Sequence, residues 1–141
     1  MFRIVAVEDA ALRDSYCRTC KIESDAGALA YAALDILDTG DADLIAVCTF
    51  TLAGGEVSRI KLGSMSDGDE AVLILLLTVA DFLRRCGYRS IVADSTVAPF
   101  AARVGFGKAD GGFVLDLTAP HGCAESRGGI TFEISYSYGL L

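Results

Sequence analysis

The chain has 141 residues, of which 52% are hydrophobic and 22% are charged. A chain of this length and composition can bury a sizeable core, so we expect one domain spanning residues 1–141 and neither disorder nor a collagen-like repeat. The 19 acidic and 12 basic residues give a net charge of −7. This acidic balance argues against nucleic acid and anionic membranes as partners.

No segment of the sequence predicts a membrane span or an export signal. The longest apolar run covers residues 71–83, whereas a spanning helix needs about 20 apolar residues. The first residues lack the basic, apolar and small-residue order of a signal peptide, so we expect a cytoplasmic protein. Five cysteines make an odd count without framework spacing, which predicts reduced thiols.

The N-terminal third begins with a strand, because residues 2–7 are rich in β-branched side chains. Asp9 can cap a following helix, which the apolar spacing extends from residue 10 to about residue 22. The segment 28–37 is ambiguous: its composition favours a helix, while the turn residues that follow it fit the end of a strand.

A hairpin and a long helix occupy the middle of the chain. The apolar segments 44–51 and 56–62 flank a glycine-containing turn at 53–55, which predicts two antiparallel strands. A helix then runs from about Asp69 to Cys86 and is apolar on nearly all sides. Such a helix is buried on more than one face.

Shorter elements complete the pattern. We predict a strand at 90–93, a short helix opened by Pro99 and ended by Gly105, and a strand at 112–117. Residues 122–129 read as a loop. Residues 131–138 alternate apolar and polar side chains, which predicts an antiparallel strand with one buried face. Because this apolar face also carries tyrosines, it could complete the sheet of a homodimer.

This order of elements resembles the GNAT acyltransferase fold over residues 44–117. The most specific stretch is Phe100-Ala-Ala-Arg-Val-Gly-Phe106 followed by the strand GFVLDL, which looks like the family's C-terminal helix and turn. The resemblance implies an α+β fold with a mixed, mostly antiparallel sheet flanked by helices. It also implies transfer of an acetyl or other acyl group from acyl-CoA to the amine of a small molecule or peptide.

The resemblance assigns a cofactor site to the end of the second hairpin strand and the start of the long helix. Backbone groups of Ile60, Lys61 and Leu62 would hold acetyl-CoA, and Gly68 and Asp69 would begin the helix whose N-terminus binds its phosphates. The family's arginine or glutamine is missing from this loop. Acidic residues surround the helix start instead, and a like charge about 8 Å away costs on the order of 2 kcal/mol at an effective dielectric near 20.

The proton-transfer group is also unusual. The family often places a tyrosine directly after the position of Phe100, where this chain has Ala101. Tyr88, Ser95 and Glu56 are the substitutes that we single out, each with a simpler structural role as the alternative. A domain that has kept the scaffold and lost the CoA site, and that acts as a binding or partner module, is therefore the second hypothesis.

A metal or redox site is the third hypothesis. Cys17 and Cys20 form a C-x-x-C pair, and His121 with Cys123 could complete a set of four ligands. The second pair has an unusual spacing. A redox C-x-x-C belongs at the start of a helix, whereas this pair falls near the predicted helix end, where the dipole raises a thiol pKa. We therefore expect incidental thiols and no metal.

Overall fold

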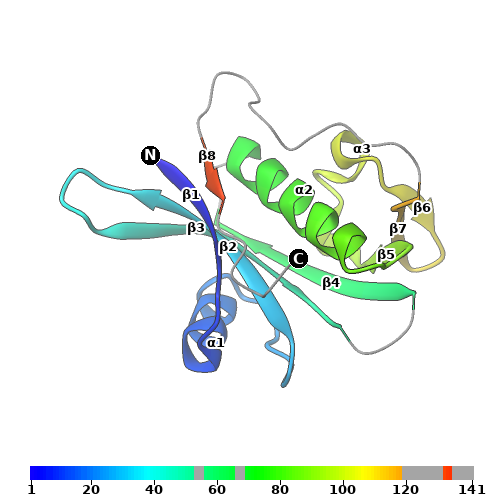
Figure 1. The fold of residues 1–141 in the computed structure, drawn as a ribbon, viewed down its shortest axis with the longest axis horizontal. Coiled ribbons are helices and arrows are strands. Elements are labelled where there is room, and N and C mark those ends of the chain that lie inside the picture. The colour runs from blue at the N-terminus through cyan, green and yellow to red at the C-terminus, as the bar shows by residue number, and fades with distance from the viewer. Residues whose placement is uncertain (53–55, 66–68, 119–131, 135–141) are drawn as a thin grey trace.

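The computed structural model describes residues 1–52, 56–65, 69–118 and 132–134. Twelve elements lie in these ranges, and Figure 1 shows them around a single sheet. In chain order they are β1 Phe2–Ala6, α1 Ala10–Thr19, β2 Leu29–Ile36, β3 Ala42–Phe50, β4 Val57–Ser64, α2 Asp69–Arg85, β5 Ser90–Ala93, the 3₁₀ helix η1 Ser95–Val97, α3 Ala101–Val104, β6 Gly107–Ala109, β7 Gly112–Asp116 and β8 Phe132–Ile134.

The sheet has eight strands in the order β6-β7-β5-β4-β3-β2-β1-β8. Five neighbouring pairs are antiparallel and two, β4–β5 and β1–β8, are parallel. The predicted α+β class with a mixed, mostly antiparallel sheet is confirmed. The parallel β4–β5 pair joins two antiparallel blocks, and α2 makes the crossover that such a pair requires.

The two faces of the sheet carry separate cores. The long helix α2 packs on one face, where its residues Val72, Ile74 and Leu75 are at most 1% exposed against side chains such as Ile60 of β4. Helix α1 covers the other face beside β2 and β3, with Cys17 in contact with that core. The predicted burial of α2 on more than one side is confirmed.

No helix in the described ranges is long and apolar enough to cross a membrane.

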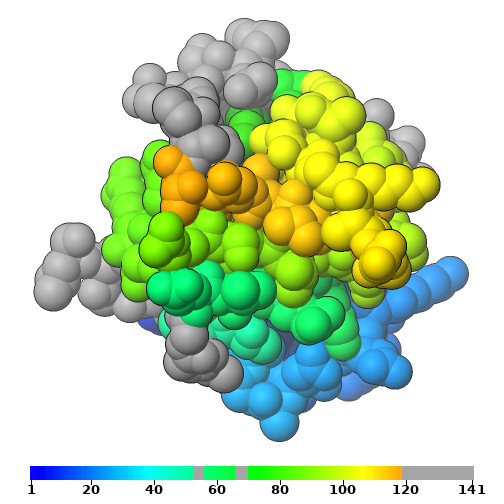
Figure 2. Space-filling model, turned by 90° about the vertical axis from the view of Figure 1, so that its right-hand side faces the viewer, coloured from blue at the N-terminus to red at the C-terminus, as the bar shows by residue number. Residues whose placement is uncertain are grey.

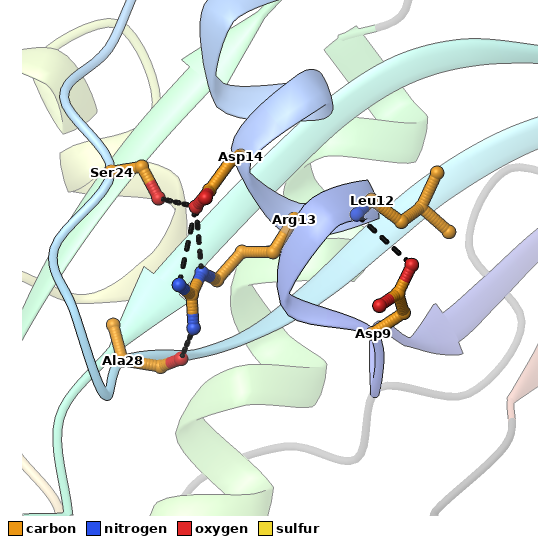
Figure 3. A network of polar contacts seen from close by, with 6 residues as sticks. All are labelled: Asp9, Leu12, Arg13, Asp14, Ser24 and Ala28. Carbon is orange, nitrogen blue, oxygen red and sulfur yellow. Dashed lines mark hydrogen bonds and ion pairs between the residues drawn. The ribbon is translucent and has the colours of Figure 1, made fainter.

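A polar network joins α1 to the segment before β2 (Figure 3). Asp9 caps the helix by accepting from the Leu12 N–H at 3.3 Å. Arg13, whose side chain is 12% exposed, donates to the carbonyl of Ala28 at 2.6 Å and to the Asp14 carboxylate at 3.1 Å. The Ser24 hydroxyl also donates to that carboxylate and, with Arg13, lowers the pKa of Asp14. The network links α1 to the chain directly before β2.

Helix α1 ends three residues earlier than its apolar spacing predicts. Lys21 has a positive φ of 61°, the left-handed conformation that glycine usually supplies after a helix. Its N–H donates to the Arg18 carbonyl at 3.2 Å, and the Ile22 N–H donates to the Cys17 carbonyl at 2.9 Å. These two bonds form a Schellman motif, so the helix stops although no glycine marks its end.

The segment 28–37, which the sequence leaves open between helix and strand, contains strand β2, which pairs with β1 on one side and β3 on the other. Two other expectations need correction. Pro99 lies in a turn between η1 and α3 rather than opening the helix. The strand expected at 131–138 is described only at 132–134, where it runs parallel, not antiparallel, to β1. The turn at 53–55, the loop at 122–129 and the tyrosine-bearing end of the last strand lie outside the described residues.

Candidate functional site

The parallel pairing of β4 with β5 stops halfway along β4. The last pair is Ile60 with Ala93, and β4 continues to Ser64 while β5 ends. The 3₁₀ helix η1 takes the place of β5 beside the rest of β4. We call this region, residues 61–64 and 94–97, the β4–η1 junction. In α/β sheets, ligands bind outside the carboxyl ends of parallel strands, and this junction is such an end.

Thr96 bridges the junction with its side chain. Its hydroxyl accepts from the Leu62 N–H at 3.2 Å and donates to the Asp94 carboxylate at 2.5 Å. The same carboxylate oxygen accepts from the Thr96 N–H at 2.9 Å, which caps η1. A side chain therefore satisfies a strand N–H that a neighbouring strand would otherwise pair. The backbone group that the Thr96 hydroxyl serves is distant in sequence, 34 positions away, and its nearby partner is a carboxylate.

A cation lies at the start of α2. Arg103 of α3 donates to the Glu70 carboxylate at 3.1 Å, with half of the arginine side chain exposed. This ion pair offsets one of the acidic charges that the sequence places at the helix start. Gly68 lies outside the described residues, and Asp69 is described in its backbone alone, as the first residue of α2.

The three predicted backbone contacts on β4 lie in different settings. Ile60 pairs with both neighbouring strands, opposite Phe50 and Ala93. Leu62 directs its N–H to the η1 side, so strand alternation directs the backbone groups of Lys61 towards β3. The Lys61 side chain lies on the α1 face and pairs with Asp25 at 3.1 Å. The role of these residues in cofactor binding stays a prediction.

The three proton-transfer candidates lie at opposite ends of β5. Tyr88 is buried just before β5, where burial raises the pKa of its phenol. Glu56 precedes β4 at the same end, and its carbonyl accepts from the Arg89 N–H at 2.8 Å. Ser95 is exposed at the other end, in η1, and belongs to the β4–η1 junction. Of the three candidates, Ser95 alone belongs to this junction.

The cysteine pair lies in a buried, mostly apolar environment. Cys17 and Cys20 are buried free thiols at the end of α1, and burial is the main cause that raises the pKa of both. The sequence pointed to the helix dipole as the cause of this effect, whereas desolvation dominates. Among the described residues, no three His, Cys, Asp or Glu side chains are grouped to hold a metal ion. His121 and Cys123 lie outside those residues.

A hollow of about 140 Å³ adjoins the last β4–β5 pair. Its walls include Arg59 of β4, Val92 of β5 and Val114 of β7, which are neighbours in the sheet register. The turn between β6 and β7 supplies Asp110 and Gly111. Figure 2 shows this side of the molecule, with the β6–β7 hairpin in yellow and orange above β5 and β4 in green. A second hollow, near Gly27 and Leu52, has no ionisable side chain in its lining.

Asp94, Arg103 and Arg59 are candidate site residues that the sequence did not single out. Arg103 belongs to the motif that carries the family resemblance, but sequence spacing does not bring it to Glu70, 33 positions earlier. Arg59 reads as an exposed position of an alternating strand, and only the register with β5 and β7 places it in the hollow.

Comparison with solved structures supports the fold. A candidate acetyltransferase from Exiguobacterium sp. 255-15 superposes with a TM-score of 0.59 at 18% identity, covering 84% of this chain and 95% of its own. A point mutant of a cAMP-binding acyltransferase from Mycobacterium smegmatis gives 0.57 at 10% identity, and the match covers 82% of this chain but 44% of that one. A domain from Methanocaldococcus jannaschii DSM 2661 gives 0.56 at 13% identity, covering 81% and 96%.

No family profile and no curated protein matches the sequence. The likeness at these identities concerns the fold alone, and the chain has a GNAT-like fold.

Proposed function

We propose that this chain is an acyl-CoA-dependent N-acyltransferase that moves an acyl group from a thioester to an amine. The observation that carries the proposal is the early end of β5, which leaves residues 61–64 of β4 beside η1 instead of a paired strand. A strand edge without a backbone partner can bind the amide groups of an extended ligand. The acyltransferases of the same fold support the reaction class.

The residues at the β4–η1 junction fit an acyl-CoA donor, which would supply the activated thioester. Leu62 would offer its N–H. In the free protein this N–H donates to the Thr96 hydroxyl at 3.2 Å, a bond that a ligand can replace. Arg103 stands at the start of α2, where guanidinium and helix N-terminus both favour phosphate. Glu70 would keep this arginine in position.

Asp94 is the proton acceptor that we propose for the amine. It follows the last paired residue of β5 and is exposed, so a substrate at the junction can reach its carboxylate. Thr96 fixes the carboxylate through two hydrogen bonds to one oxygen. Orientation of this kind allows a general base to act without reorganisation when the amine arrives.

Titration calorimetry with acetyl-CoA tests the donor site. Wild-type protein should bind with micromolar affinity, and Arg103→Ala should weaken binding about tenfold, because a charge-assisted contact to phosphate is lost. Arg85→Ala is the matched control: it breaks a similar ion pair, with Asp81 at 3.0 Å, at the far end of α2. No heat up to millimolar acetyl-CoA would refute the donor site.

A binding module without catalysis is the second candidate, and two observations favour it. Ala101 is 4% exposed at the position of the family's frequent tyrosine and has no proton to give. The Leu62 N–H already donates a hydrogen bond to the Thr96 hydroxyl. Loss of thioester absorbance in the presence of an amine panel separates the two candidates: binding without any loss of thioester would favour the module.

A further inference from the structure

We infer that the hollow beside the last β4–β5 pair binds the acceptor, and that this acceptor is a free amino acid or another small amine bearing a carboxylate. The identification of the ligand as an acceptor rests on the proposed function, but the binding site can be tested without acyl-CoA. Its central residue is Arg59, the cation in the wall of the hollow.

Arg59 has no ion-pair partner in the part of the chain that the structure describes, whereas several other cationic side chains have one. Lys61, two residues along the same face of β4, pairs with Asp25 at 3.1 Å. Arg84 and Arg85 share Asp81, and Arg103 pairs with Glu70. The Arg59 guanidinium is therefore available, and its planar fork matches a carboxylate in two parallel hydrogen bonds.

The opposite wall of the hollow supplies the complementary charge. Asp110 stands in the β6–β7 turn and lines the same space, yet no ion pair within 4.0 Å joins it to Arg59. A ligand with one positive and one negative group can therefore satisfy both walls. Val92 and Val114 lie between them and offer apolar contact to a short carbon chain.

The volume of the hollow limits the size of the ligand. About 140 Å³ corresponds to roughly five water molecules at about 30 Å³ each, so the space holds a small amino acid or one end of a larger amine. Ala93, the last residue of β5 to pair with β4, lines the hollow directly. A ligand in the hollow therefore lies beside the β4–η1 junction, where the proposed donor would bind.

The net charge of −7 does not contradict an anionic ligand. Charges at the surface are screened within about 8 Å at physiological ionic strength, so the nearest groups decide the local preference. In the hollow these groups are one guanidinium and one carboxylate. An acceptor chosen by net charge alone would be a simple cation, and the lining of the hollow argues for a zwitterion instead.

The test is a nuclear magnetic resonance titration of the ¹⁵N-labelled protein in the absence of acyl-CoA. The probes are the common L-amino acids, each compared with its α-amide, and propionate compared with L-alanine. At least one amino acid should shift the amide signals of Gly111 and Gly112 and bind about tenfold more tightly than its amide. Arg59→Ala should remove this preference, and Arg59→Lys should keep part of it.

Arg18→Ala is the matched control, because it removes one exposed cation from the end of α1 and leaves the hollow intact. It should bind the amino acid as the wild type does. Equal binding of acid and amide, an unchanged preference in Arg59→Ala, or no binding by any probe would overturn the inference. Acyl transfer only to amines without a carboxylate would support the proposed function and refute the acceptor site. Arg59-dependent binding of an amino acid without any acyl-CoA binding would support the site and refute the proposed function.

Discussion

A methyl group at Gly112 should push the neighbouring strands β5 and β7 apart. A Cβ at this position would lie 2.2 Å from the carbonyl oxygen of Ala93 and 3.3 Å from its carbonyl carbon, whereas ordinary contact begins at 3.4 Å. Because the obstacle is backbone, no side-chain rotation relieves it. Strands β5 and β7 must separate by roughly 1 Å, about a fifth of the usual spacing between neighbouring strands.

The expected cost follows from that separation. Moving a strand by roughly 1 Å lengthens the nearest inter-strand hydrogen bonds beyond useful range, and each contributes about 1 kcal/mol. Overpacking adds about 1–3 kcal/mol. Gly112→Ala should therefore lower the free energy of unfolding by about 3 kcal/mol, a large share of the roughly 5–15 kcal/mol that holds a typical domain.

Urea unfolding followed by circular dichroism measures this loss, with Gly111→Ala as the control. Gly111 has a φ of +76° and open space around a Cβ, so an alanine there meets backbone strain alone, about 1 kcal/mol. The prediction fails if Gly112→Ala costs no more than its neighbour. Both variants need an m-value close to that of the wild type, since a change would signal a different unfolding process.

Three further predictions concern other elements. Thr96→Val should cost about 1–2 kcal/mol in thermal unfolding, because the Leu62 N–H loses its acceptor; equal loss in Thr96→Ser would contradict this. Lys21→Gly should stabilise α1 by up to about 1 kcal/mol by relieving the positive φ; urea unfolding that shows a loss would count against it. Burial raises the pKa of the Cys17, Cys20 and Cys48 thiols. The unfolded chain therefore loses these protons at a lower pH than the folded protein does, and the free energy of unfolding should fall above about pH 9. Cys48→Ala should flatten that fall, and a pH-independent urea midpoint would refute the prediction.

The middle of the chain could be predicted because its signals are local. The hairpin of β3 and β4 follows from two apolar segments around a turn, and α2 follows from a long apolar run with acidic residues at its start and Gly87 after its end. Gly87 has a positive φ of 92°, the conformation that its position predicts. Each of these features depends on residues that are close in sequence.

The rest depends on contacts between distant residues. Lys21 adopts a left-handed conformation without the glycine that would announce it. Strand β6 has three exposed residues and forms only because β7 folds back on it. The direction of β8 is set by its pairing with β1, and alternation of side chains is the same for parallel and antiparallel strands.

The cofactor site that the sequence places at the end of β4 stays a prediction, and the contacts around it depend on distant residues. The sequence placed the donor at the end of β4, and the structure shows β5 ending beside that segment. It could not show that the Leu62 N–H is held by Thr96 or that Arg103 reaches Glu70, because both contacts join residues more than 30 positions apart. The backbone direction of Lys61 likewise depends on strand register.

The pairing of β1 with β8 has a consequence for synthesis in the cell. Phe2 and Ile4 are synthesised long before residues 132–134, the segment that pairs with their outer edge. Translation adds about 5–20 residues per second, so this edge stays open for seconds while β2 already covers the other side. An open strand edge is a template for pairing with other chains. Aggregation during translation should therefore concentrate at β1, and a nascent chain stalled before residue 132 should engage holding chaperones longer than the released protein.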